Sequence, residues 1–89
     1  MKRYFIETNG YNCIAFVDSD NKAIVFDEIC FDETLTIEYA KKADYSNLDG
    51  CETAQECINA IGGESNNITL VDNFDDEFTN SEDVTITEF

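Results

Sequence analysis

Three short apolar segments open the chain, and runs of turn-forming residues separate them. These segments are rich in Phe, Tyr, Ile and Val, which are common in strands. The pair Asn9-Gly10 lies between the first two segments and favours a type I′ turn, in which both central residues have positive φ. A second turn of the same character is expected at Asp18 to Asn21. The pattern therefore predicts an antiparallel meander whose strands cover residues 3–8, 11–17 and 23–29.

The middle segment of the meander is apolar on both of its faces. Because side chains alternate along a strand, one face carries Phe5, Ile14, Phe16 and Val25 in the expected register, and the other carries Cys13, Ala15 and Val17. A strand of this kind is central and needs cover on both sides. We expect helices on the face of Cys13. The face of Ile14 is then covered by the C-terminal segment or by a partner.

Segment 32–44, DETLTIEYAKKAD, fits two structures. Its apolar residues alternate as in a strand from Leu35 to Tyr39, and they also lie on one helical arc that continues to Ala40 and Ala43. The AKKA ending and a possible cap at Asp32 favour a helix over residues 34–43.

Segment 53–63, TAQECINAIGG, predicts a helix more clearly. Thr53 and Glu56 have the spacing of a capping box, in which the hydroxyl binds the amide three residues later and the carboxylate reaches back. The spacing of Ala54, Cys57, Ile58 and Ile61 gives one buried stripe. Gly62 suits the left-handed residue that ends a helix.

Alternating apolar and polar residues predict two further strands, in segments 66–71 and 83–89. The order of elements is then β-β-β-α-α-β-β. At 89 residues the chain has the length of one domain, residues 1–89. We predict an α+β fold with one antiparallel sheet and two helices packed on one face.

Charge is distributed very unevenly along this chain. The net charge is −15, and all five bases lie within residues 1–42, whereas residues 43–89 hold twelve acids and no base. Twelve unpaired carboxylates repel one another and destabilise the compact state. The excess serves either solubility or a positively charged partner. Direct binding of nucleic acid is disfavoured because binding to phosphate depends on Lys and Arg, and anionic membranes are disfavoured for the same reason.

Catalytic and metal-binding patterns are missing from the sequence. It contains no His, which excludes Ser-His and Cys-His nucleophiles, and it has no Gly-rich phosphate loop. The four Cys are not paired as in a zinc site. Segment 18–29 begins like an EF-hand, but Lys22, Ala23 and Ile29 stand at positions that need other residues. We expect a non-enzyme without cofactor or metal.

The cysteines and the first residues bear on the compartment. No apolar run of a secretory signal follows the basic start MKRYFIETNG. We therefore expect four reduced thiols and a cytoplasmic protein, in the host cytoplasm if it is encoded by a phage.

The densest acidic stretch indicates where a basic partner binds. Its acids are Asp72, Asp75, Asp76, Glu77, Glu82 and Asp83, and Phe74 and Phe78 flank the run of three in the middle. A second group precedes and begins the helix at 53–63, namely Asp44, Asp49, Glu52 and Glu56. The carboxylates supply charge, and Phe74, Phe78 and Tyr45 are expected to be the apolar anchors.

In length, charge and mixed α/β character, the whole chain resembles the small acidic inhibitors that phages and mobile elements encode against CRISPR effectors and restriction enzymes. This resemblance implies a nucleic-acid mimic that occupies a basic DNA-binding site, most closely as an anti-CRISPR-type blocker. Two alternatives stay open. One is an immunity-type or antitoxin-type protein that neutralises a basic toxin or nuclease. The other is an acidic accessory domain without a charged partner.

Overall fold

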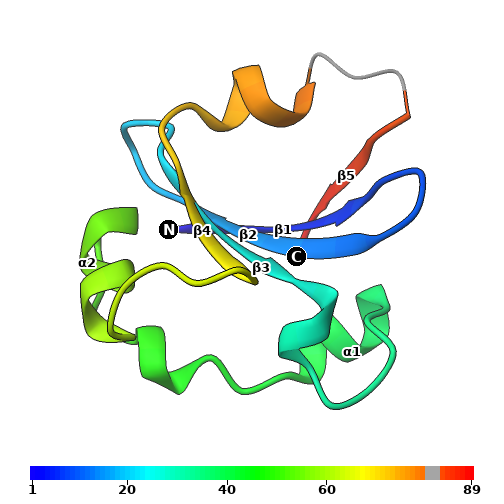
Figure 1. The fold of residues 1–89 in the computed structure, drawn as a ribbon, viewed down its shortest axis with the longest axis horizontal. Coiled ribbons are helices and arrows are strands. Elements are labelled where there is room, and N and C mark those ends of the chain that lie inside the picture. The colour runs from blue at the N-terminus through cyan, green and yellow to red at the C-terminus, as the bar shows by residue number, and fades with distance from the viewer. Residues whose placement is uncertain (80–82) are drawn as a thin grey trace.

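A single five-stranded antiparallel sheet forms the centre of the molecule (Figure 1). The computed structural model describes residues 1–79 and 83–89. The strands are β1 (Lys2–Glu7), β2 (Asn12–Val17), β3 (Ala23–Asp27), β4 (Ile68–Val71) and β5 (Thr85–Glu88). Their order is β4-β3-β2-β1-β5. The predicted α+β class, the meander and the central place of β2 are confirmed.

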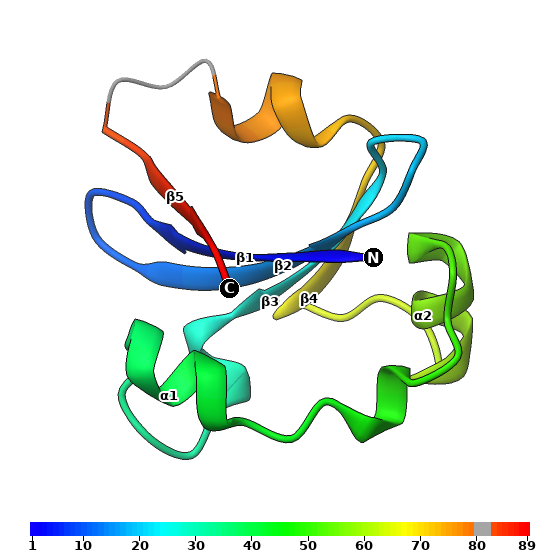
Figure 2. The ribbon, with the colours of Figure 1, turned by 180° about the vertical axis from the view of Figure 1, so that it is seen from behind.

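Helical segments connect β3 to β4 and β4 to β5. Between β3 and β4 lie the 3₁₀ turn η1 (Glu28–Cys30), helix α1 (Ile37–Lys42), the 3₁₀ turn η2 (Ser46–Leu48) and helix α2 (Ala54–Ala60). Between β4 and β5 lies η3 (Asp75–Thr79), one turn of π-helix. Seen from behind, α1 and α2 lie on one side of the sheet and η3 lies on the other (Figure 2).

The β1–β2 turn differs from the type I′ turn that Asn-Gly predicts. Only Gly10 of the pair has positive φ, at 131°. The Gly10 amide donates to the Thr8 carbonyl oxygen over 2.9 Å, and the Thr8 amide donates to Tyr11 O, also over 2.9 Å. A three-residue turn closed on Thr8 needs no left-handed residue at its centre. Asn9 therefore keeps a negative φ.

Helix α1 is present but shorter than the predicted helix over 34–43. Its N-cap is Thr36, whose hydroxyl accepts from the Tyr39 amide at 3.2 Å, so the expected cap at Asp32 is wrong. Leu35 lies just before the cap with 1% of its surface exposed. Its carbonyl accepts from the Asn12 side-chain amide at 3.0 Å. This bond holds the preceding chain extended against β2, so the helix begins later.

Helix α2 begins and ends as predicted, with one difference. The Thr53 hydroxyl accepts from the Glu56 amide at 3.1 Å. The Glu56 carboxylate reaches back to the amide of Glu52, at 3.1 Å, rather than to that of Thr53. Gly62 follows the helix with φ of 96°. Residues Thr53 and Glu56 thus cap the start of α2 from within its own segment.

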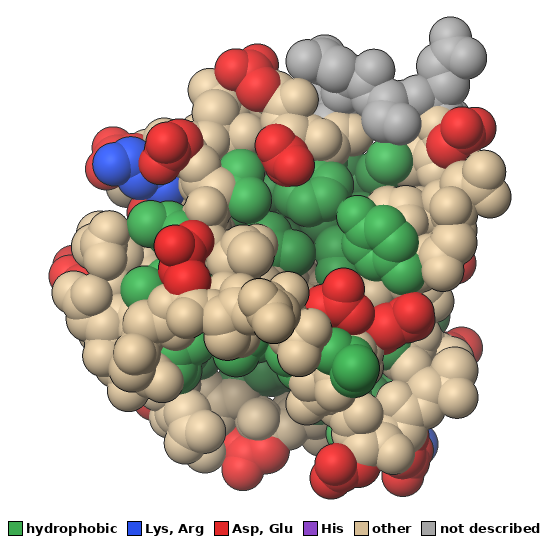
Figure 3. Space-filling view, viewed as in Figure 1, with side chains coloured by type: hydrophobic (Ala, Val, Ile, Leu, Met, Phe, Trp, Pro, Cys, Tyr) green, Lys and Arg blue, Asp and Glu red, His purple; other side chains and the backbone are tan. Residues whose placement is uncertain are grey.

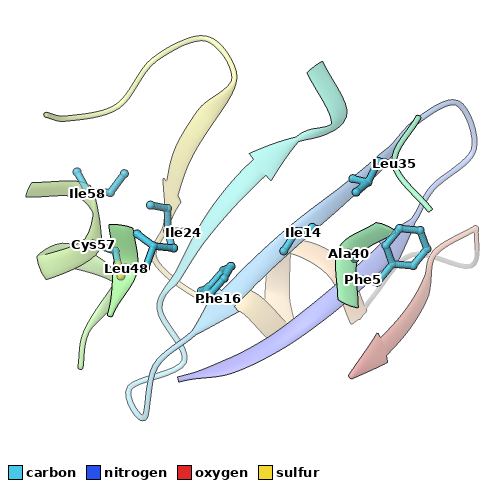
Figure 4. Packing of buried hydrophobic residues seen from close by; sticks show 9 residues of the cluster. All are labelled: Phe5, Ile14, Phe16, Ile24, Leu35, Ala40, Leu48, Cys57 and Ile58. Carbon is cyan, nitrogen blue, oxygen red and sulfur yellow. The ribbon is translucent and has the colours of Figure 1, made fainter. Parts of the chain in front are cut away.

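Each face of the sheet has its own buried cluster, and the predicted faces are reversed. The helices cover the face of Phe5, Ile14 and Phe16, where Ile24, Leu35, Ala40, Leu48, Cys57 and Ile58 complete the first cluster (Figure 4). The C-terminal segment covers the other face, where the second cluster contains Ile6, Cys13, Ala15, Val17, Ala23, Phe74 and Phe78. Val25 pairs with Ala15 and packs against this second cluster.

Side-chain size explains why the covers take these faces. Close packing matches large residues with small ones across an interface. The bulky face of Phe5 and Phe16 receives Ala40 and Cys57 from the helices. The other face includes the small side chains of Cys13, Ala15 and Ala23 beside Ile6 and Val17, and two Phe rings pack there.

Candidate protein-binding surfaces

The C-terminal segment buries its aromatic residues and exposes its acids. Phe74 and Phe78 are 4% and 8% exposed. The Phe74 ring stacks on Tyr4, with ring centroids 5.2 Å apart, and lies 5.3 Å from the Phe78 ring. The expectation that Phe74 and Phe78 act as exposed anchors for a partner is therefore wrong. They hold this segment on the sheet.

The turn between β2 and β3 fixes the start of η3. The Asn21 carbonyl oxygen accepts from the Phe74 amide at 2.7 Å. The Asn21 side chain accepts from the Asp75 amide at 3.0 Å and donates to the Asp75 carboxylate at 2.8 Å. Asn73 caps η3, because its side-chain oxygen accepts from the Asp76 amide at 3.1 Å. The acidic stretch thus has a defined backbone.

The outer side of this segment carries the first group of predicted site residues. Asp72, Asp75, Asp76, Glu77 and Asp83 are all exposed, and we call these five residues the C-terminal acidic surface. Glu82 lies outside the described residues. The view in Figure 3 shows many more Asp and Glu side chains than Lys or Arg around a central hydrophobic patch. The charge that the sequence places here therefore faces outward.

The second predicted group lies on the other side of the sheet. Asp44, Asp49, Glu52 and Glu56 are exposed around η2 and the start of α2. Hydrogen bonds from the Ser46 backbone and side chain lower the pKa of the Asp44 carboxyl. The structure therefore separates the two groups, with one link: Glu52 and Asp75 line the same open hollow, which Lys2 also lines.

Asp18 is a buried acid that the sequence did not single out as structural. It is 7% exposed, and its carboxylate accepts from the amides of Asp20 (2.9 Å), Lys22 (3.0 Å) and Ala54 (2.9 Å). Burial raises the pKa of this carboxyl, but the three backbone hydrogen bonds together lower it by more, so the pKa lies below its usual value. Asp18 thus ties the β2–β3 turn to the first residue of α2.

A hollow of about 510 Å³ on the helix face was not predicted. Its walls include Phe26, Phe31, Tyr39, Tyr45 and Ile68, and two acids, Asp32 and Asp44, also line it. The signal in the sequence was a set of aromatic residues at 26, 31, 39 and 45. Their spacing follows no single helix or strand, so periodicity did not reveal them.

Tyr45, expected to be an exposed anchor, is half-buried at this hollow. Its hydroxyl donates to the Ala40 carbonyl oxygen at 2.8 Å, and burial raises its pKa to about 12. The Arg3 guanidinium lies 5.7 Å from the Tyr45 ring centroid and 5.1 Å from that of Phe89. Aromatic rings on this face therefore already accept a cation.

The four cysteines are free thiols: Cys13 and Cys57 are buried, Cys30 is exposed and Cys51 is half-buried. Burial raises the pKa of Cys13 to about 12, and the nearby carboxylates of Asp27 and Glu28 add to this. Burial also raises the pKa of Cys57 to about 12, together with a hydrogen bond to the Cys51 side chain. Thiols with such pKa values are weak nucleophiles at neutral pH.

Within residues 1–79 and 83–89, no group of three or more Cys, Asp or Glu side chains is arranged to hold a metal ion. The helices of this part of the chain are also too short and polar for any of them to span a bilayer. Comparison with protein-family models, with curated proteins and with solved structures gives no match to this chain. Its surface chemistry therefore carries the functional argument.

Proposed function

We propose that this protein inhibits a basic, nucleic-acid-binding protein by occupying the site that otherwise holds DNA or RNA, in the manner of an anti-CRISPR-type blocker of a CRISPR effector. The observation that supports this proposal is the C-terminal acidic surface. Asp72, Asp76 and Glu77 are exposed on a segment whose Phe residues are buried beneath them. Such a surface offers negative charge on a segment that its buried Phe rings hold on the sheet.

A dense array of carboxylates resembles a nucleic acid in its negative charge, which attracts a basic binding site. Duplex DNA carries one negative charge per about 1.7 Å of helix axis. Here three acids follow one another at Asp75, Asp76 and Glu77, and no base lies in residues 43–89. Opposite charge would speed association with a basic groove and make it sensitive to salt.

The test begins with capture of the partner. The protein is immobilised, a bacterial lysate is applied at low salt, and bound proteins are eluted with a salt gradient. We expect nucleic-acid-binding proteins to elute as ionic strength rises. Candidate CRISPR effectors are then tested directly: the protein should displace duplex DNA from the effector in a mobility-shift assay.

The decisive variant is Asp72→Asn with Asp76→Asn and Glu77→Gln. It removes three charges and leaves Asp75, which binds Asn21, in place. We expect affinity for the partner to fall on the order of tenfold or more. The matched control also removes three charges, at exposed positions beside α1 that belong to neither predicted group, as Glu7→Gln with Glu33→Gln and Glu38→Gln. A partner that binds the triple variant as tightly as the parent at low and high salt rules out the C-terminal acidic surface.

A further inference from the structure

The hollow on the helix face is a separate concave site, on the side of the sheet away from the C-terminal acidic surface. Residues of η1, α1, η2 and the strands β3 and β4 line it. Its volume, about 510 Å³, is within the range of sites that hold small groups. The lower half of Figure 3 shows a depression with hydrophobic side chains at its back.

The walls of this hollow have the geometry that favours a cation. Phe31 and Tyr39 meet edge to face, with ring centroids 5.9 Å apart and an interplanar angle of 82°. Two nearly perpendicular rings present π faces in two directions, and π faces attract cations. Tyr45, on the same wall, already lies under the Arg3 guanidinium. Phe31 and Tyr39 are therefore the rings that a second cation can use.

Charge complements this aromatic wall. Asp32 and Asp44 line the hollow and are exposed. Asp44 is held ionised by its hydrogen bonds to Ser46, one of which joins its carboxylate to the Ser46 amide at 2.9 Å. Lys42 does not line this hollow; it lines the adjoining one, which it shares with Asp32 and Tyr39 and with the acids Glu33 and Glu38. Two carboxylates thus border an apolar recess whose described lining contains no base.

We propose that this hollow binds an arginine side chain of a partner protein. The guanidinium stacks on Phe31 or Tyr39 and pairs with Asp32 and Asp44, while the methylene groups pack against the apolar wall. Arginine suits the site better than lysine because its planar head stacks on aromatic rings and forms paired hydrogen bonds with carboxylates. This site does not depend on the C-terminal acidic surface, so either proposal can fail alone.

The test uses the whole protein, labelled with ¹⁵N, and three short peptides. Acetyl-Gly-Arg-Gly-amide is compared with its lysine and citrulline counterparts, since citrulline keeps the shape of arginine without the charge. We expect amide shifts at Phe31, Asp44 and Tyr45 that saturate with the arginine peptide. Binding should be weaker with the lysine peptide, and absent with citrulline.

Substitutions in the hollow test which side chains bind the arginine peptide. Asp32→Asn with Asp44→Asn should weaken the arginine peptide on the order of tenfold, and the Asn at position 44 can still accept from the Ser46 amide. Tyr39→Leu should weaken it as well, whereas Tyr39→Phe should not. The matched control, Asp20→Asn with Glu88→Gln, removes the same charge at exposed positions outside both proposed surfaces. It should change affinity by less than about twofold, because salt screens distant charges.

Three outcomes would overturn the inference. One is equal binding of the arginine and citrulline peptides, which would make the hollow a neutral apolar site. Another is that amide shifts appear at η3 rather than at the hollow. The last is that no peptide shifts these resonances. Each result leaves the test of the C-terminal acidic surface untouched.

Discussion

The two faces of the sheet are covered in different ways. One face carries two helices, two 3₁₀ turns and the aromatic hollow, supplied by the long connection from β3 to β4. The other is covered by a much shorter connection, which contributes the buried rings of Phe74 and Phe78 to the second cluster, with Val84 packed against it. Few residues of this connection therefore cover a whole face of the sheet.

The two faces also differ in where their acidic residues lie. On the helix face, the acids are dispersed along several elements, and Glu56 also serves in a cap. On the other face, the acids are concentrated on one turn directly above the buried rings. We call residues 72–79, which cover this face, the thin cover. We infer that the thin cover is the less stable part of the fold, because its own carboxylates repel one another and few side chains hold it.

The largest expected effect comes from removing one ring of the thin cover. Phe74→Ala should destabilise the protein by about 3 kcal/mol or more, since Phe-to-Ala changes in cores cost about 3–5 kcal/mol. It removes the stacking on Tyr4 as well as buried surface. Urea unfolding measures the loss.

Amide exchange then decides whether the cover is a separate unit. We expect exchange to rise first in residues 72–79, with α1 and α2 still protected. Phe16→Ala on the other face is the matched control, because it should lower protection throughout. Uniform loss of protection in Phe74→Ala would show that the two covers unfold together.

Asp18→Ala should have the next largest effect, about 2–3 kcal/mol, because it leaves buried amide groups unsatisfied. Asp18→Asn keeps an acceptor oxygen and should cost less. Both are measured by urea unfolding at pH 7, with Asp20→Asn, at the exposed side chain in the same turn, as the control. A cost near zero for Asp18→Ala would mean that water replaces the carboxylate.

The difference in unfolding free energy between the parent and Asp18→Asn should change with pH in a definite direction. The pKa of Asp18 is lower in the folded state than its ordinary value of 3.8. Its ionised form therefore stabilises the fold fully above that ordinary value, and the contribution is lost as pH falls through the folded pKa. The difference in unfolding free energy between the parent and Asp18→Asn should become smaller below about pH 4. A larger difference there would contradict a stabilising role for ionised Asp18.

The two buried thiols allow the covers to be compared directly. Cys13 lies under the cover formed by Phe74 and Phe78, and Cys57 lies in α2, with 1% and 0% of their surfaces exposed. Each thiol must be uncovered before it reacts, so a difference in labelling rate reports on opening. We expect Cys13 to react with iodoacetamide on the order of tenfold faster than Cys57, which corresponds to about 1.4 kcal/mol of opening free energy. Mass spectrometry of peptides follows both sites, and faster labelling of Cys57 would reverse our ranking of the covers.

The smallest effect concerns surface charge. Asp72→Asn with Asp76→Asn and Glu77→Gln should leave stability unchanged or raise it by about 0.5 kcal/mol, since self-repulsion falls. Added salt should raise the melting temperature of the parent more than that of the variant. A clear drop in melting temperature for the variant would give these carboxylates a structural role.

The sequence predicted the elements of this fold better than their contacts. Apolar segments between turn signals revealed β1 to β3, alternation revealed β4 and β5, and Thr53 with Gly62 marked the ends of α2, because these signals are local. Val25 was assigned to the wrong face because its side depends on the register between strands, which pairs Val25 with Ala15. The covers were reversed because alternation shows which residues share a face and not which connection crosses that face. The start of α1 depends on Asn12, far away in sequence.

The candidate sites were predicted to a smaller extent. Exposure of Asp72, Asp76 and Glu77 followed from charge alone. Burial of Phe74 and Phe78 did not, since a Phe between acids fits both an anchor for a partner and an anchor for the fold. The hollow around Tyr39 was missed because its walls come from five separate elements.

The β2–β3 turn has a consequence for engineering. Its Asp18 binds α2 on one side of the sheet, and its Asn21 binds η3 on the other. A peptide tag inserted between Ser19 and Asp20 would therefore loosen both layers at once. Among residues 1–79 and 83–89, the hydrogen bonds of the turn at Asn9 and Gly10 join it to its own neighbours Thr8 and Tyr11. It is the better place for a fluorophore or affinity handle, because a probe there can report on partner binding while the molecule stays assembled.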